Sequence, residues 1–76
     1  MIIRSQNGNN ITTDLNLNIR FMDRWKIENE RFFLGTYSTE EKAIKVLKMI
    51  CDMYANYASG YAINNSIFQM PQDSEV

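Results

Sequence analysis

The chain of 76 residues has no histidine, one cysteine, one proline and three glycines. Without histidine it cannot form a serine–histidine or cysteine–histidine catalytic pair, nor a histidine metal site. The single Cys51 excludes an internal disulfide and a cysteine-cluster zinc site. Three scattered glycines cannot form a glycine-rich phosphate-binding loop. These absences predict that the protein is not an enzyme and holds neither a metal nor a cofactor.

Charge and hydropathy indicate the compartment and the partners. Eight Lys/Arg residues against nine Asp/Glu residues give a net charge of −1, without the basic excess that nucleic-acid binding normally needs. No apolar run is long enough to span a membrane, and the N-terminal residues lack the apolar segment of a signal peptide. We therefore expect a cytoplasmic protein with a reduced Cys51 and no nucleic-acid or membrane partner.

Alternation of apolar and polar residues predicts strands in the first half of the chain. Residues 2–4 form a short candidate strand, and the following Asn7-Gly8 pair is a strong hairpin signal. The segment 11–21 alternates with a period of two and predicts one long strand. Two further apolar segments, 25–27 and 32–34, predict the next strands, with Gly35 ending the last one. The pattern is that of an antiparallel meander of three to five strands.

A period of 3.6 residues replaces the alternation after Ser38 and predicts one long helix over residues 39–58. Ser38 and Glu41 have the spacing of a capping box at its start. The fold class is therefore α+β, with a single domain over residues 1–70 and an acidic, disordered tail over 71–76. The predicted core consists of Leu15, Leu17, Ile19, Phe21, Trp25, Ile27, Ile44, Leu47, Ile50, Cys51 and Tyr54.

Two groups of basic residues are candidate anion-binding residues. The first lines one face of the predicted helix, and the second lies around the central strands beside Phe21 and Trp25. Arginine beside an aromatic ring is suited to stack on a base or hold a phosphate. Solvated lysines and core aromatics explain the same pattern without a ligand. The candidates are Lys42, Lys45 and Lys48 in the first group and Arg20, Arg24, Lys26 and Arg31 in the second.

The chain has more aromatic residues than one thin core needs, which predicts self-association. One helix about 10 Å wide covers only two strands spaced about 4.8 Å apart, so a wider sheet leaves apolar surface uncovered. We expect a homodimer or higher homo-oligomer, in which such surface is buried between copies. The expected interface residues are Tyr54, Tyr57, Tyr61 and Phe68.

Three segments resemble a family of short proteins from phages and prophages of Gram-positive bacteria. They are residues 1–6 (MIIRSQ), residues 34–47 (LGTYSTEEKAIKVL) and residues 68–76 (FQMPQDSEV). Residues 7–33 depart from the family pattern, so the resemblance implies no site there. It implies a small accessory protein of viral type, produced inside an infected host cell.

The residues and this resemblance together favour a non-enzymatic binding protein that counteracts host defence. It would either sequester a nucleotide-derived signal or block a defence protein, and the alternative is a structural or regulatory interaction module without a defence role. A signal-binding protein should gather Arg20, Arg24 or Arg31 with a tyrosine into a pocket between subunits. A protein inhibitor should instead carry a broad exposed patch.

Overall fold

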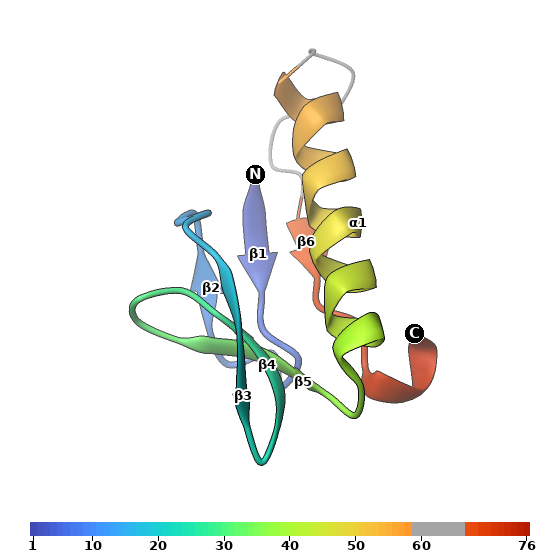
Figure 1. The fold of residues 1–76 in the computed structure, drawn as a ribbon. Coiled ribbons are helices and arrows are strands. Elements are labelled where there is room, and N and C mark those ends of the chain that lie inside the picture. The colour runs from blue at the N-terminus through green and yellow to red at the C-terminus, as the bar shows by residue number, and fades with distance from the viewer. Residues whose placement is uncertain (59–66) are drawn as a thin grey trace.

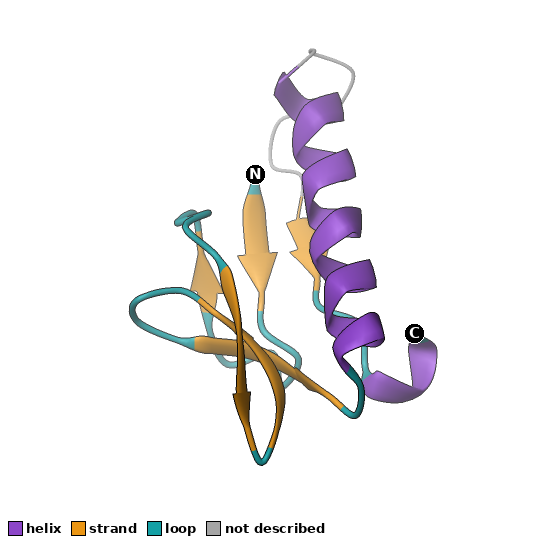
Figure 2. Cartoon of the chain, in the orientation of Figure 1, coloured by secondary structure: helices purple, strands orange, loops and turns teal. Residues whose placement is uncertain are grey.

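The computed structural model describes residues 1–58 and 67–76 and has the α+β fold that the sequence predicts (Figures 1 and 2). Two small three-stranded sheets lie to one side of one long helix, whose N-terminal end lies beside the C-terminus (Figure 1). The elements are β1 (Ile2–Arg4), β2 (Ile11–Thr12), β3 (Asn18–Met22), β4 (Arg24–Glu28), β5 (Phe33–Tyr37), α1 (Glu40–Ala58), β6 (Ile67–Gln69) and the 3₁₀ helix η1 (Asp73–Glu75).

The first sheet has the strand order β2-β1-β6. The predicted hairpin joins β1 to β2, and Gly8 adopts a φ of 76° while its N–H donates to the Ser5 carbonyl at 2.9 Å. β6 pairs with β1 in parallel, with Ile3 opposite Phe68. The arrangement is therefore not the simple antiparallel meander that the sequence suggests, because the last strand returns beside the first.

The second sheet has the order β3-β4-β5 and is antiparallel throughout. Asp23, with a φ of 62°, turns the chain between β3 and β4. Asn29 ends β4 by accepting hydrogen bonds at its side-chain oxygen from the N–H groups of Arg31 and Phe32, at 2.9 and 2.8 Å. These hydrogen bonds form a turn that lets β5 run antiparallel to β4.

The single long strand predicted over residues 11–21 is wrong. Regular pairing stops after Thr12 and resumes at Asn18, because side chains between them bond to nearby backbone instead. Thr12 Oγ1 accepts from the Asp14 N–H at 3.0 Å, and Asp14 Oδ1 accepts from the Asn16 N–H at 3.0 Å. The intervening segment carries Leu15 and Leu17, both of which are half-buried at the edge of the core.

The core lies where α1 packs against β4 and β5. Its buried members are Ile3, Ile27, Leu34, Tyr37, Ala43, Val46, Ile50, Phe68 and Met70. Of the predicted core, Ile27 and Ile50 are buried, whereas Leu15, Leu17, Ile19, Trp25 and Leu47 are only half-buried. The exposed exceptions are Phe21, Ile44, Cys51 and Tyr54.

Two physical reasons explain these corrections. Phe21 points to the core side of β3 but lies beyond the two strands that α1 mainly covers, so 61% of it is exposed. On α1, the buried stripe is Ala43, Val46 and Ile50, which is rotated about the helix axis from the predicted face centred on Leu47.

Gly35 lies inside β5 and does not end it. A Cβ at this position would lie 3.0 Å from the Tyr37 hydroxyl and 3.1 Å from Met70 Cε. The absence of a side chain lets Tyr37 and Met70 close over the strand, which is a common reason for glycine inside a sheet.

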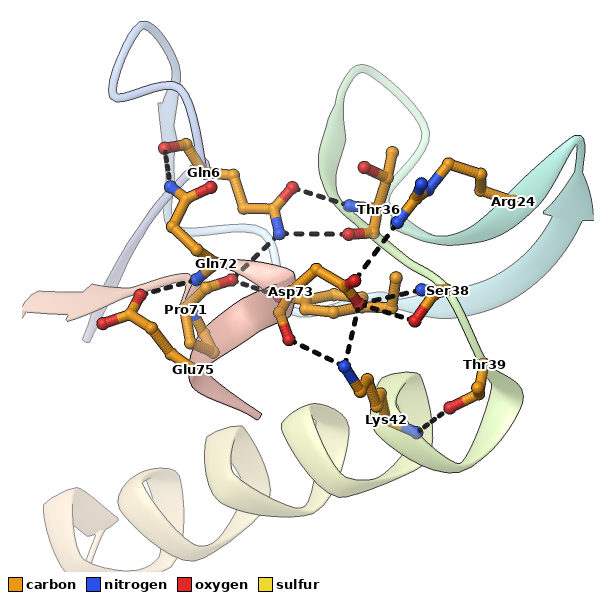
Figure 3. Close-up of polar contacts among 11 residues, drawn as sticks. Gln6, Arg24, Thr36, Ser38, Thr39, Lys42, Pro71, Gln72, Asp73 and Glu75 are labelled. Carbon is orange, nitrogen blue, oxygen red and sulfur yellow. Dashed lines mark hydrogen bonds and ion pairs between the residues drawn. The ribbon is translucent and has the colours of Figure 1, made fainter.

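The helix N-cap is Thr39 rather than the predicted Ser38. Thr39 Oγ1 accepts from the Lys42 N–H at 3.2 Å, one turn into α1. The Ser38 backbone N–H and hydroxyl instead donate to Asp73 Oδ1, at 2.8 and 3.1 Å (Figure 3). Residues 72–76 are therefore held by the body of the protein, whereas the sequence predicts that they are disordered.

We call the residues that fasten the C-terminal segment the clasp. Its members are Gln6, Thr36, Ser38, Lys42, Pro71 and Asp73, which Figure 3 labels, together with Tyr37. The side-chain amide of Gln6 pairs with Thr36 as a strand would, accepting from its N–H at 2.8 Å and donating to its carbonyl at 3.1 Å. The same Gln6 nitrogen and the Tyr37 hydroxyl both donate to the Pro71 carbonyl, at 2.9 Å each. One amide side chain thereby joins both sheets to the C-terminal segment.

Candidate functional site

The outer side of the second sheet carries three of the predicted basic residues together. Cross-strand partners share a face of a sheet, and the register places Arg20 opposite Lys26 and Met22 opposite Arg24. Phe33, opposite Glu28 on β5, joins this side, because Lys26 Nζ lies 4.9 Å from the centre of its ring. We call Arg20, Met22, Arg24, Lys26 and Phe33 the basic face.

Each cation of the basic face has a partner within the chain. Arg20 lies 3.7 Å from a Glu28 carboxylate oxygen, and Arg24 lies 3.4 Å from Asp73. Lys26 lies over the Phe33 ring, which is a cation–π arrangement. The two arginine side chains are nevertheless 56% and 49% exposed, so they can still contact a partner.

The basic face has the mixed chemistry of a binding surface. Met22 and Phe33 are 45% and 47% exposed, which adds apolar surface between the charges. Arg20 and Lys26 lie directly opposite each other, and like charges in this position destabilise a sheet. An acidic partner would relieve that repulsion.

The remaining basic candidates lie elsewhere. Arg31 is in the β4–β5 loop, where it lines an open hollow with Asp14 and Glu30. Lys42 belongs to the clasp, 3.5 Å from Asp73 Oδ1, with its Nζ also donating to the Asp73 carbonyl at 2.9 Å. Lys45 and Lys48 are exposed on α1. The structure thus gathers three of the seven predicted residues on one face of the sheet. Lys42 shares the Asp73 carboxylate with Arg24, and the other three residues lie apart.

A hollow of about 520 Å³ lies beside Arg20. Its lining includes Glu28 and Glu30 together with Asn16 and Asn18. Two carboxylates against one guanidinium make this hollow unfavourable for a phosphate group. The exposed surface of the basic face is therefore better suited to an acidic partner than this hollow is.

The charged groups of the clasp have shifted pKa values. The Ser38 N–H is the largest influence that lowers the pKa of Asp73 below its usual value, and Lys42 and Arg24 act in the same direction. Burial raises the pKa of Tyr37 above its usual value of 10.0. Both shifts favour the state that holds the clasp together at neutral pH, a charged Asp73 and a neutral Tyr37.

The predicted buried thiol and the predicted interface residues need correction. Cys51 is exposed on α1, in a groove that it lines with Leu15, Leu17 and Tyr54. Phe68 is a core residue rather than an interface residue. Tyr54 is 47% exposed, Tyr61 lies outside the described residues, and the side chain of Tyr57 is likewise not described.

Sequence reasoning missed Met22 and Phe33 as members of the site. Met22 lies at the tip of the β3–β4 hairpin. It follows the alternating segment 11–21, so the sequence pattern does not assign it to a face of the sheet. Phe32, Phe33 and Leu34 form a continuous apolar run, so no alternation indicates which of them faces outward. The irregular register near Ile27 and Glu28 decides that Phe33 does.

Within residues 1–58 and 67–76, no cluster of three or more cysteine, aspartate or glutamate side chains could hold a metal ion. In the same part of the chain, no helix has the length and apolarity needed to cross a bilayer. No family model matches the sequence, and neither the curated proteins nor the solved structures contain a match.

Proposed function

We propose that the protein is a non-enzymatic binding protein whose basic face docks on an acidic surface of another protein. The observation that carries this proposal is the direct opposition of Arg20 and Lys26 on an exposed sheet face. A protein that binds nothing there would be more stable with unlike or neutral residues at these positions. Exposed Phe33 and Met22 add the apolar contacts that charged surfaces alone lack.

An acidic protein suits this face better than a nucleotide-like ligand does. Sequestering a small anion needs arginines that converge with a tyrosine in a pocket. Arg31 lies apart from Arg20 and Arg24, and the buried Tyr37 belongs to the clasp on the other side of β5. Arg20, Arg24 and Lys26 instead spread over two neighbouring strands, which is the broad patch expected of a protein inhibitor.

The resemblance to phage proteins gives this binding a biological context. A small viral accessory protein that binds an acidic protein surface inside an infected cell would act by blocking a host defence protein. Within residues 1–58 and 67–76, the three segments that carry the resemblance meet in the clasp. The basic face takes all five of its members from residues 7–33, the stretch that departs from the family pattern. We infer that the clasp maintains the fold and that the variable stretch selects the partner.

The test combines charge reversal with site-specific cross-linking in infected, defence-positive cells. A photoreactive residue replacing Met22 should cross-link to one host protein, whereas the same residue replacing Met49, which is 41% exposed on α1, should not. Arg20→Glu with Lys26→Glu should remove the cross-link and weaken binding of the purified partner by about tenfold to a hundredfold. Arg31→Glu, away from the basic face, is the matched control and should leave both unchanged.

Three outcomes would contradict the proposal. Equal cross-linking from positions 22 and 49 would show that the basic face does not select a partner. Native mass spectrometry that finds a retained nucleotide-like molecule, lost on charge reversal, would favour the sequestration hypothesis. Protection of the phage that is unchanged by Arg20→Glu with Lys26→Glu would favour an interaction module without a role in defence at this face.

A further inference from the structure

The helix α1 carries two apolar stripes, and among the residues that the structure describes one stripe is buried and the other is largely exposed. Ala43, Val46 and Ile50 form the buried stripe against the second sheet. The second stripe, which we call the exposed stripe, consists of Ile44, Leu47, Cys51 and Tyr54. Ile44 and Tyr54 are 51% and 47% exposed, Cys51 is exposed and Leu47 is half-buried.

The spacing of the exposed stripe is that of a helix–helix seam. Its members follow one another at intervals of three, four and three residues, which are the a and d positions of a heptad. No charged residue interrupts these positions. Such spacing is suited to a second helix, whose side chains would pack between those of the exposed stripe along its whole length. It is less suited to a flat or irregular surface.

A groove of about 270 Å³ runs beside the exposed stripe. One wall is formed by Leu47, Cys51 and Tyr54 of α1, and the other by Leu15 and Leu17 of the segment between β2 and β3. Both walls are apolar, and Cys51 is the smallest side chain of the four in the stripe. The groove can therefore receive the larger side chains of a second helix.

We propose that a second copy of this chain occupies the groove, with the two α1 helices packed antiparallel about a twofold axis that passes midway between Leu47 and Cys51. In this arrangement Leu47 of each chain packs against Cys51 of the other, and Ile44 packs against Tyr54. Large side chains thus meet smaller ones in two symmetric pairs, so the stripe is complementary to itself. Antiparallel packing also opposes the helix dipoles favourably, whereas parallel packing would align them.

The charge of the chain is compatible with self-association. The net charge is −1, so two copies meet without strong mutual repulsion. The exposed stripe lies on α1, while the basic face lies on the outer side of the second sheet, so a dimer leaves the basic face free for its own partner. The dimer does not rest on the proposed function, and either can fail alone.

Sedimentation of the full chain at tens of micromolar tests the dimer. The wild-type protein should sediment at twice 8.9 kDa. Ile44→Glu places a charge in the seam and should raise the dimer dissociation constant about a hundredfold, giving a monomer. Because Ile44 is exposed in the single chain, this variant should keep the wild-type circular dichroism spectrum. Met49→Glu, exposed on the same helix but off the stripe, is the control and should remain a dimer.

Cross-linking tests the orientation. In a Cys51→Ser background, a mixture of Ile44→Cys and Tyr54→Cys chains should form a disulfide between chains on mild oxidation. The wild-type protein should form no Cys51–Cys51 disulfide, because the twofold axis separates these residues along the helices by more than a disulfide can span. A monomeric wild-type protein, a dimer that survives Ile44→Glu, or a rapid Cys51–Cys51 disulfide would each overturn the proposal.

Discussion

The clasp and the basic face differ in how completely their polar groups are satisfied within the chain. In the clasp, Gln6, Tyr37 and Asp73 all make short hydrogen bonds to groups distant in sequence, and Tyr37 is fully buried. In the basic face, Arg20 and Lys26 oppose each other, and the arginine side chains are about half exposed. The clasp uses its polar groups in hydrogen bonds between distant segments, whereas the basic face keeps its arginine side chains about half exposed beside their partners within the chain.

This difference indicates which residues contribute to the stability of the fold and which are available to bind a partner. At the buried Tyr37, removing one partner of its hydrogen bond to Pro71 leaves the other partner unsatisfied, so this part of the clasp supports the fold. Exposed ion pairs contribute little to stability, so the residues of the basic face can be exchanged without unfolding the protein. Substitutions in the clasp should therefore change stability, and substitutions in the basic face should change binding.

The largest effect is expected at Tyr37, where the clasp meets the core. Tyr37→Ala removes a fully buried ring and should lower the free energy of unfolding by about 3–5 kcal/mol, which is a large part of the stability of so small a domain. Tyr37→Phe keeps the ring and loses only the bond to Pro71, so it should cost about 1 kcal/mol. Urea denaturation measures both. Similar costs for the two variants would mean that the ring contributes little beyond its hydroxyl.

A smaller effect is expected at Gln6. Gln6→Ala removes the side-chain bonds to Thr36 and Pro71 and should lower the free energy of unfolding by about 2–3 kcal/mol, at about 1 kcal/mol for each bond. Hydrogen exchange should show faster exchange of the Thr36 amide, which the Gln6 side chain protects. Asn18→Ala, at an exposed position in β3, is the control. An unchanged Thr36 amide would argue against the strand-like role of the Gln6 side chain.

Acid should weaken the clasp through Asp73. Its pKa is lowered in the folded protein, so the folded state favours the charged carboxylate, and this stabilisation is present above the usual value of 3.8. It is lost as the pH falls through the lowered value. Thermal melts between neutral pH and pH 2 should show this loss, and Asp73→Asn should remove that part of the pH dependence. An Asp73→Asn protein with the wild-type profile would contradict the assignment.

Alkali should act on the same region through Tyr37. Because burial raises its pKa, the unfolded chain ionises at lower pH than the folded one, and the stabilisation is present below the usual value of 10.0. Stability should therefore fall as the pH rises above that value. Tyr37→Phe lacks the titrating group and should lose less stability over this range, as thermal melts can measure.

The smallest effect on stability is expected at the basic face. Lys26→Thr removes the like charge opposite Arg20 in exchange for a β-branched residue, and should change the free energy of unfolding by no more than about 0.5 kcal/mol. Chemical denaturation measures this directly. A large destabilisation would mean that Lys26 stabilises the fold through its contact with the Phe33 ring and is not available to bind a partner.

Sequence reasoning predicted much of the fold and part of the site. The hairpin at Asn7-Gly8 and the helix could be read from local signals, because turn residues and apolar periodicity act over a few positions. The sequence grouped Arg20, Arg24 and Lys26 around the central strands, and the strand register places the three on one face of the sheet. The parallel return of β6 to β1 could not be predicted, since that pairing joins residues far apart in the sequence.

The sequence by itself determined the hairpin after β1 and the long helix, because turn chemistry and helix periodicity are local properties of the chain. Tertiary structure decided which side of α1 is buried. Ala43, Val46 and Ile50 on one stripe and Ile44, Leu47 and Cys51 on the next are similarly apolar, so hydropathy alone does not distinguish them. The position of β4 and β5 selects the first stripe, because a sheet can cover only one side of a helix, and the second remains exposed.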